Sequence, residues 1–264
     1  MKVILARLLI RVLAAIGQHF SSVRRVMISE WVLWRNHICV TPDDASGTTR
    51  EIYRRRFALS LRQWLLYYQH RVIFSRSTWM GVKMIKNPLD AWIYQELLYE
   101  VQPDIVIEIG SASGGSTLFL AHLLDIIGKG QVISIDIDRS NYHVQHPRII
   151  EITGDLSSPH VVNQVAKLCR DKTVMVIHDG DHRKEQVLKD LSLYSPLVSV
   201  GSYFVVEDGI VDLFRPHEMM WEKCSGPLAA VEEFVRINPH FSIDLEREKY
   251  LITYNPRGYL RRCK

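Results

Sequence analysis

Two short acidic segments, each directly after an apolar run, hold the side chains best suited to catalysis. The segment HDGDH (178–182) follows the run TVMVI, and Glu207-Asp208 follows SYFVV. If both runs are parallel strands of one sheet, their acidic ends meet at the same edge. Carboxylate oxygens favour a hard cation such as Mg²⁺, whereas zinc prefers nitrogen and sulfur. The sequence therefore predicts Asp179, Glu207 and Asp208 as ligands of Mg²⁺ or a similar divalent cation.

A glycine-rich segment, EIGSASGGS (108–116), lies between an apolar run and a stretch with helical spacing. Glycines there let the backbone approach a ligand closely, and the start of the following helix offers free amide donors to a carboxylate. Glu108 is suited to accept from an ammonium group. The GxGxxG of nicotinamide enzymes and the Gly-Lys-Ser of a P-loop are both absent from the segment. We predict that it binds S-adenosylmethionine, with a generic tight turn as the alternative. The predicted contacts are Glu108, Gly110, Ser111, Ser113, Gly114, Gly115 and Ser116.

Two more carboxylates follow the next apolar runs and extend the predicted cofactor pocket. Asp136 ends the second run, where this kind of sheet places a carboxylate against ribose hydroxyls. Asp155 ends the third run and is expected on the adenine side. Asp138 competes with Asp136 for the ribose position, but a solvated loop acid explains it more simply.

Apolar runs that alternate with helix-compatible stretches predict a doubly wound α/β fold. Right-handed crossovers place the carboxyl ends of the parallel strands at one rim, where ligands bind. The last two runs lie close together and are expected to form an antiparallel pair. We predict a mostly parallel, seven-stranded class I methyltransferase sheet with an N-terminal helical extension. The seven runs are DIVIEIG, QVISIDI, RIIEITG, TVMVIHDG, SYFVVEDG, FSIDLE and YLITYNP.

Residues 1–78 are predicted to form the helical extension, and residues 79–264 the methyltransferase domain. Arg7 and Arg11 interrupt the apolar N-terminus, so no uncharged run reaches the about 18 to 20 residues that cross a bilayer. The two arginines share a narrow polar edge of the helical wheel, which is typical of a helix in the membrane interface. We predict peripheral membrane contact through residues 1–25. The alternative is packing on the protein or on a second subunit of a homo-oligomer.

The composition excludes several classes of partner and site. With 47% hydrophobic residues among 264, the chain can bury a full core. The net charge of +4 is mild and its Lys and Arg are scattered, so no nucleic-acid surface is predicted. The four cysteines, Cys39, Cys169, Cys224 and Cys263, form no CxxC pair, which argues against a zinc cluster and a disulfide framework. A cytoplasmic protein is expected, on the inner face of the membrane if its N-terminus binds lipid.

Five long segments between about Trp79 and Arg261 resemble the cephalosporin hydroxylase family. They are WMGVKMIKNPLDAWIYQE, VIEIGSASGGS, VMVIHDGDHRKEQVL, PLVSVGSYFVVED and EREKYLITYNPRGYL. Despite its name, the family has a methyltransferase fold and includes rhamnosyl O-methyltransferases of glycolipid assembly. The resemblance implies S-adenosylmethionine, Mg²⁺ and the same three metal ligands. The sequence departs from the family after Asp208, where only Gly226-Pro227 remains of a Gly-Pro-Gly-Pro. That segment would cover the acceptor pocket, so the departure concerns the acceptor rather than the cofactor.

These residues together predict a Mg²⁺-dependent O-methyltransferase that acts on a hydroxyl of a sugar, glycolipid, polysaccharide or specialised metabolite. The metal would stabilise the acceptor alkoxide and hold it in line with the methyl sulfonium. His182 or Asp181 would remove the proton, and histidine is favoured because its pKa lies near working pH. If HDGDH is only a polar turn, Asp181 would instead cap the following helix.

Two other functions fit the sequence less well. Hydroxylation or oxidoreduction at a metal, which the family name suggests, would favour two histidines and one carboxylate around non-haem iron, and here carboxylates dominate. A non-catalytic partner protein that binds the cofactor would need neither a metal site nor a base.

Overall fold

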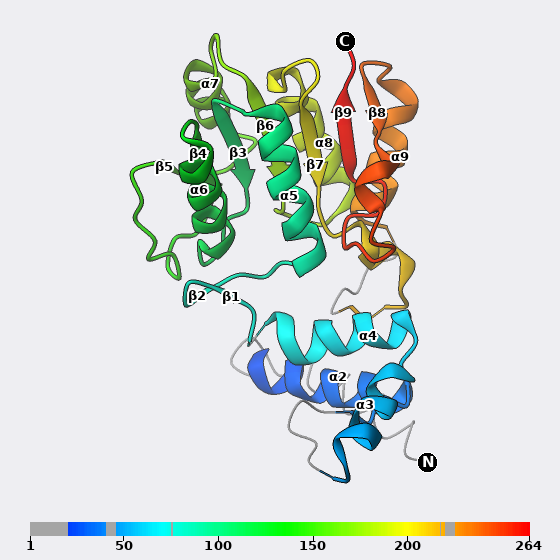
Figure 1. Cartoon of the computed structure of the whole chain (residues 1–264). Coiled ribbons are helices and arrows are strands. Elements are labelled where there is room, and N and C mark those ends of the chain that lie inside the picture. The colour runs from blue at the N-terminus through cyan, green and yellow to red at the C-terminus, as the bar shows by residue number, and fades with distance from the viewer. Residues whose placement is uncertain (1–20, 41–45, 75, 217, 220–224) are drawn as a thin grey trace. The chain divides into compact units, whose positions relative to one another are not determined.

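The computed structural model describes residues 21–40, 46–74, 76–216, 218–219 and 225–264 (Figure 1). The chain divides into two compact units. The larger contains Ser77–Phe214 and Lys223–Lys264, and the smaller contains Met1–Arg76 and Arg215–Glu222. The predictions for residues 1–20 lie outside the described residues, as does Cys224.

A seven-stranded sheet forms the centre of the larger unit, in the order β5-β4-β3-β6-β7-β9-β8. The first five strands along this sheet are parallel, and β9 runs antiparallel to both of its neighbours. This arrangement confirms the predicted class I methyltransferase sheet. The strands are β3 (Ile105–Ile109), β4 (Gln131–Asp136), β5 (Ile149–Thr153), β6 (Val174–His178), β7 (Tyr203–Val206), β8 (Phe241–Ile243) and β9 (Tyr259–Arg262).

Helices cover both faces of the sheet because successive strand side chains point to opposite sides (Figure 1). Ile105, Ile107 and Ile109 of β3 pack in the core that includes residues of α7, α8 and α9. Val106 between them belongs to the core that includes residues of α5 and α6. The helices are α5 (Pro88–Val101), α6 (Gly115–Ile127), α7 (Pro159–Leu168), α8 (Lys184–Tyr194) and α9 (Pro227–Ile237), with the short helices η3 (Ser195–Leu197), η4 (Gly209–Leu213) and η5 (Leu245–Glu248). A small hairpin of β1 (Thr78–Trp79) and β2 (Val82–Lys83) precedes α5.

The second strand of the final antiparallel pair is not where the sequence predicted it. The run YLITYNP (250–256) forms turns, and the strand begins only at Tyr259. The reason is that polar groups of this run are used outside any sheet: Thr253 Oγ1 and the Tyr254 amide donate to the buried Asp90 carboxylate. Pro256 also has no amide hydrogen for a strand ladder. The run therefore packs on α5 instead of extending the sheet.

The smaller unit contains α2 (Ser21–Arg35), α3 (Thr49–Phe57), α4 (Leu61–Tyr68) and η2 (Gln69–Ile73). Capping boxes fix the starts of two of them, from Thr48 to Glu51 and from Ser60 to Gln63. Among the described helices of the chain, none has the length and apolarity that crossing a bilayer requires.

Candidate active site

The glycine-rich loop lies directly against the loop that follows β6. Gly110 directly follows β3 and has φ of +83°, and a Cβ there would lie 2.1 Å from the Asp179 carbonyl oxygen. Any larger residue would therefore push the two loops apart. Gly114 caps the start of α6. The sequence thus brings its predicted cofactor loop and its predicted metal loop into contact through the backbone.

Glu108, on β3, is fully buried beneath this loop. Its Oε2 accepts from the Thr117 hydroxyl, and its Oε1 has no hydrogen-bond partner among the residues that the structure describes. Burial raises the pKa of the Glu108 carboxyl, against the lowering effect of nearby Lys86. A buried carboxylate oxygen without a partner is costly unless a ligand donates to it. Glu108 therefore suits the ammonium group of a bound amino acid moiety.

A cavity of about 500 Å³ opens at the carboxyl ends of β3, β4 and β6. Gly110, Asp136, Asp155 and Asp179 all line it, and so does Asp181. The other predicted cofactor contacts are not in the cavity wall. Glu108 is buried on β3, and the adjoining loop and first turn of α6 contain Ser111, Ser113, Gly114, Gly115 and Ser116.

Asp136 ties the cofactor loop to the end of β4. Its Oδ2 accepts from the backbone amides of Ser111 and Ala112, at 3.0 and 2.8 Å. Asp138 makes only local contacts, accepting from the amide and hydroxyl of Ser140, and it is not part of the cavity wall. The structure thus separates the two acids: Asp136 lines the cavity, and Asp138 is exposed.

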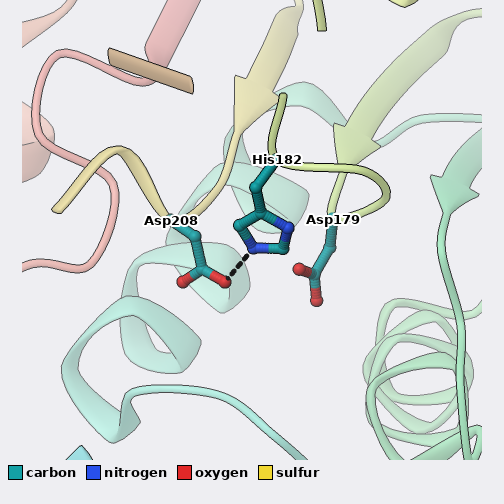
Figure 2. A group of neighbouring side chains, drawn as sticks. All are labelled: Asp179, His182 and Asp208. Atoms are coloured by element: carbon teal, nitrogen blue, oxygen red, sulfur yellow. Dashed lines mark hydrogen bonds and ion pairs between the residues drawn. The ribbon is translucent and has the colours of Figure 1, made fainter. Parts of the chain in front are cut away.

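Asp179, His182 and Asp208 come together at the ends of β6 and β7. One ligand atom from each lies within 4.8 Å of the others, and the imidazole lies between the two carboxylates (Figure 2). His182 Nε2 is hydrogen-bonded to Asp208 Oδ2 at 2.7 Å. Burial opposes protonation of His182, but the hydrogen bond and the negative charges of Asp208 and Asp179 outweigh it and raise the pKa of His182 to about 9. The cluster is one imidazole with two carboxylates, which differs from the two-histidine, one-carboxylate pattern of non-haem iron.

Glu207 is not part of this cluster and contacts Lys86 instead. Its side chain is buried, and Lys86 Nζ lies 2.6 Å from both of its carboxylate oxygens and 2.6 Å from Asp179 Oδ2. The Tyr94 hydroxyl donates to Glu207 Oε1 at 2.5 Å. Burial raises the pKa of the Glu207 carboxyl strongly, and the Lys86 charge opposes that rise. Of the three predicted metal ligands, the structure therefore groups Asp179 and Asp208 with His182, and Glu207 with Lys86.

Asn255, in the segment before β9, supports the backbone at Asp208 just after β7. Its Oδ1 accepts from the Asp208 amide at 3.1 Å, and its Nδ2 lies 3.4 Å from both the Tyr94 and Tyr259 hydroxyls. Asp208 has φ of +59°, a left-handed conformation that is uncommon for residues with a side chain. The buried Asn255 thus stabilises the conformation that directs Asp208 toward His182.

Asp181, the second predicted base, is engaged locally. It accepts from the Arg183 amide at 2.8 Å and from Arg183 Nε at 2.6 Å, and this pairing lowers the pKa of Asp181. The alternative role as helix cap is wrong, because the N-cap of α8 is Arg183 and it makes no side-chain cap. His178 from the same segment is buried and hydrogen-bonded to Asp190 of α8 at 2.9 Å.

Known proteins are similar in sequence to most of this chain. A family model described as Rhamnosyl O-methyltransferase/CmcI matches residues 71–263. A rhamnosyl O-methyltransferase of Mycobacterium leprae (strain TN) is 34% identical over 201 residues, which cover 74% of this chain and 86% of the relative. The chain belongs to the rhamnosyl O-methyltransferase/CmcI family. The rhamnosyl O-methyltransferase of Mycobacterium tuberculosis (strain H37Rv) is 30% identical over 224 residues, or 82% of this chain and 90% of the relative.

Solved structures of CmcI have the same fold as the larger unit. CmcI with Mg and SAM matches with a TM-score of 0.58 and 23% identity, over 85% of this chain and 89% of that one. The apo structure of CmcI matches with a TM-score of 0.54 and 20% identity, over 85% and 88%. The predicted family and fold are thereby confirmed, and the predicted cofactors agree with the ligands of the CmcI complex.

Three residues of the site escaped prediction, although all lie in segments that carry the family resemblance. Lys86 and Tyr94 belong to WMGVKMIKNPLDAWIYQE, and Asn255 belongs to EREKYLITYNPRGYL. The only available signal was that each of these polar residues lies in a segment that resembles the family, at a position that the helix or strand pattern does not require to be polar. Without the fold, no argument from spacing brings residues 86, 94 and 255 to the ends of β6 and β7.

Proposed function

We propose that this member of the rhamnosyl O-methyltransferase/CmcI family transfers the methyl group of S-adenosylmethionine to a hydroxyl of a sugar, with help from a divalent cation such as Mg²⁺. The observation that carries the proposal is the position of Asp179, which lines the 500 Å³ cavity and also belongs to the cluster with His182 and Asp208. A cofactor in the cavity and a cation at the cluster would then be neighbours. A rhamnose on a glycolipid or other saccharide is the favoured acceptor, because the curated relatives are rhamnosyl O-methyltransferases.

The proposed cofactor contacts combine acids of the cavity wall with polar groups of β3 and of the adjoining start of α6. Glu108 Oε1 would accept from the ammonium of S-adenosylmethionine, and the amides at the start of α6 would bind its carboxylate. Asp136 would accept from the ribose hydroxyls, and Asp155 would lie on the adenine side.

The donor set at the cluster fits a hard divalent cation. Asp179 and Asp208 of the cluster would each supply an oxygen. Glu207, which contacts Lys86 beside Asp179, is proposed as the third carboxylate. When bound, Mg²⁺ supplies Lewis-acid stabilisation of the acceptor oxygen. With a dication bound nearby, His182 would lose its proton more readily and would then be the neutral base that proton removal requires. His182 would take the proton of the acceptor hydroxyl, and Asp208 would stabilise the resulting imidazolium.

The test is methyl transfer itself. Purified protein, Mg²⁺ and deuterium-labelled S-adenosylmethionine are incubated with rhamnose-containing glycolipids and with free saccharides, and products are analysed by mass spectrometry. We expect a labelled methyl group on a sugar hydroxyl, and its loss after treatment with a chelator. Asp179→Asn and Asp208→Asn should each abolish transfer while S-adenosylhomocysteine still binds. Transfer untouched by the chelator would remove the metal from the proposal.

We also propose that residues 1–78 act as a helical extension of the methyltransferase domain at 79–264, and that residues 1–25 contact the inner face of the membrane. A charged helix in the described part supports this. α3 has no buried residue and carries four arginines against one glutamate in TREIYRRRF. Phe57, at its end, is 81% exposed. Cationic and aromatic side chains together suit an anionic lipid surface. Association into a homo-oligomer through the same region is the alternative proposal.

A further inference from the structure

Lys86 is the buried cation of the site. Its side chain is only 4% exposed, and its ammonium contacts Asp179 Oδ2 and both oxygens of Glu207 at 2.6 Å. Burial alone would lower the pKa of Lys86, but the negative charges of Asp179 and Glu207 more than reverse this, so its pKa is raised and the ammonium stays charged. Lys86 directly precedes Asn87, the N-cap of α5, so its backbone is next to a fixed helix start.

The Lys86 ammonium offsets part of the negative charge of three neighbouring carboxylates. Asp179, Glu207 and Asp208 bring three carboxylates to neighbouring positions, and Asp179 is shared between Lys86 and the cluster of Figure 2. Three carboxylates and one ammonium sum to a formal charge of −2, which one divalent cation would neutralise once His182 is neutral. Without a metal, the Lys86 ammonium and a protonated His182 are both counter-ions of these buried carboxylates.

We propose that Lys86 is a resident cation that competes with the divalent metal for Asp179 and Glu207, and so sets the metal affinity of the site. Lys86 holds the two carboxylates in position before metal binds. When metal binds, the ammonium must share or release the oxygens that it contacts, and its positive charge repels the incoming ion. This inference rests on the metal site of the proposed function. It also explains how Glu207 is engaged by Lys86 here and yet is available to a metal once the ammonium withdraws.

Replacement of Lys86 tests this without any activity measurement. Lys86→Met removes the charge. Lys86→Gln also removes the charge but keeps a hydrogen-bond donor, so it can be measured if the methionine variant folds poorly. Binding of Mg²⁺ is measured by calorimetry, and of Mn²⁺ by electron paramagnetic resonance, in the presence of S-adenosylhomocysteine. Both ions should bind the variants roughly tenfold more tightly than the wild type, because repulsion between cations is weakly screened at a buried site.

Lys129→Met is the matched control. Lys129 pairs with Asp104 at 3.0 Å on the same unit, with side chains 43% and 35% exposed, so its loss removes an equal charge from the surface. Metal affinity should stay within about twofold in this variant, since exposed charges are screened. The melting temperature gives a second readout: metal-free Lys86→Gln should unfold below the wild type, and saturating Mg²⁺ should remove the difference.

Two results overturn the inference in different ways. If the wild type binds neither Mg²⁺ nor Mn²⁺, the metal part of the proposed function fails, and the competition fails with it. If the wild type binds metal but both Lys86 variants bind it equally or more weakly, Lys86 is only a structural partner of the carboxylates. In that case the metal site survives and the inference alone is wrong.

Discussion

The hydrogen bond between His182 Nε2 and Asp208 Oδ2 distinguishes the two candidate bases at the level of single residues. His182 contacts a carboxylate of the proposed metal site at 2.7 Å, so the proton it gains is stabilised where the acceptor would lie. Asp181 is paired with Arg183, and its lowered pKa makes it a weak proton acceptor. These contacts support the proposal that His182 rather than Asp181 is the base.

His182→Ala should therefore keep cofactor and metal binding and lose turnover by about 10²- to 10⁴-fold, as for other lost general bases. Partial recovery is expected as pH rises, because the acceptor hydroxyl then ionises without a base. The measurement is kcat against pH at saturating Mg²⁺. Asp181→Asn is the control and should stay within a few-fold of wild type. A loss in Asp181→Asn as large as in His182→Ala would reverse the assignment.

Asp136 and Asp138 form a second pair that the structure separates. Asp136→Ala should weaken S-adenosylmethionine and S-adenosylhomocysteine binding by about 1.5 to 3 kcal/mol, the usual contribution of hydrogen bonds to a charged group. Asp136 lines the cavity and also holds the Ser111 and Ala112 amides, so both effects act in the same direction. The affinity of each protein for both ligands is measured by calorimetry, with Asp138→Ala as the control. Equal affinities in all three proteins would contradict the cofactor placement.

At the level of elements, the strands that are marked by apolar runs were predicted correctly from the sequence. The five apolar runs from residue 104 to 209 became β3 to β7, because buried parallel strands need apolar side chains on both faces. The last run failed for the opposite reason: YLITYNP is apolar enough for a strand, but Thr253 and Asn255 bond to residues 90 and 208, which are distant in sequence. Such contacts depend on the finished fold. For the same reason Lys86, in the loop between β2 and α5, was not found.

Asp90 joins α5 to the 253–259 segment and should make stability depend on pH. Desolvation raises the pKa of Asp90 from 3.8 to about 6, although bonds from Thr253, Tyr254 and Tyr259 oppose the rise. Because the folded pKa is raised, the contribution of Asp90 to stability is complete below pH 4 and is lost as pH rises through about 6. At 1.36 kcal/mol per unit, the loss is about 3 kcal/mol.

The comparison of wild type with Asp90→Asn isolates this effect. The free energy of unfolding of the wild type, relative to the variant, should fall by that amount between pH 4 and pH 7.5, because Asn does not ionise. Urea titrations followed by tryptophan fluorescence at several pH values provide the measurement. A difference that is flat, or that rises with pH, would show that Asp90 is ionised in the folded protein throughout this range.

At the level of the whole molecule, the two units differ in how far their function can be inferred. The family match at 71–263 contains nearly all of the larger unit, and with it every residue of the proposed site. Most of the smaller unit lies before that match, so its role must come from its own chemistry. There the prominent features are the arginines of α3 and the apolar N-terminus with Arg7 and Arg11.

Membrane contact is the prediction that belongs to this scale. The full chain should float with vesicles that contain anionic lipid and sediment without them, and added salt should weaken binding because the attraction is electrostatic. Removal of residues 1–17 should abolish flotation, since it removes the apolar segment that would insert between headgroups. Arg54→Glu with Arg55→Glu should weaken it if α3 faces the same surface. Both variants should keep S-adenosylhomocysteine binding, because the cavity lies in the larger unit. If the truncated and full-length proteins float equally, the segment instead packs on the protein or on a second copy, and the truncated chain should then show a changed oligomeric state by light scattering.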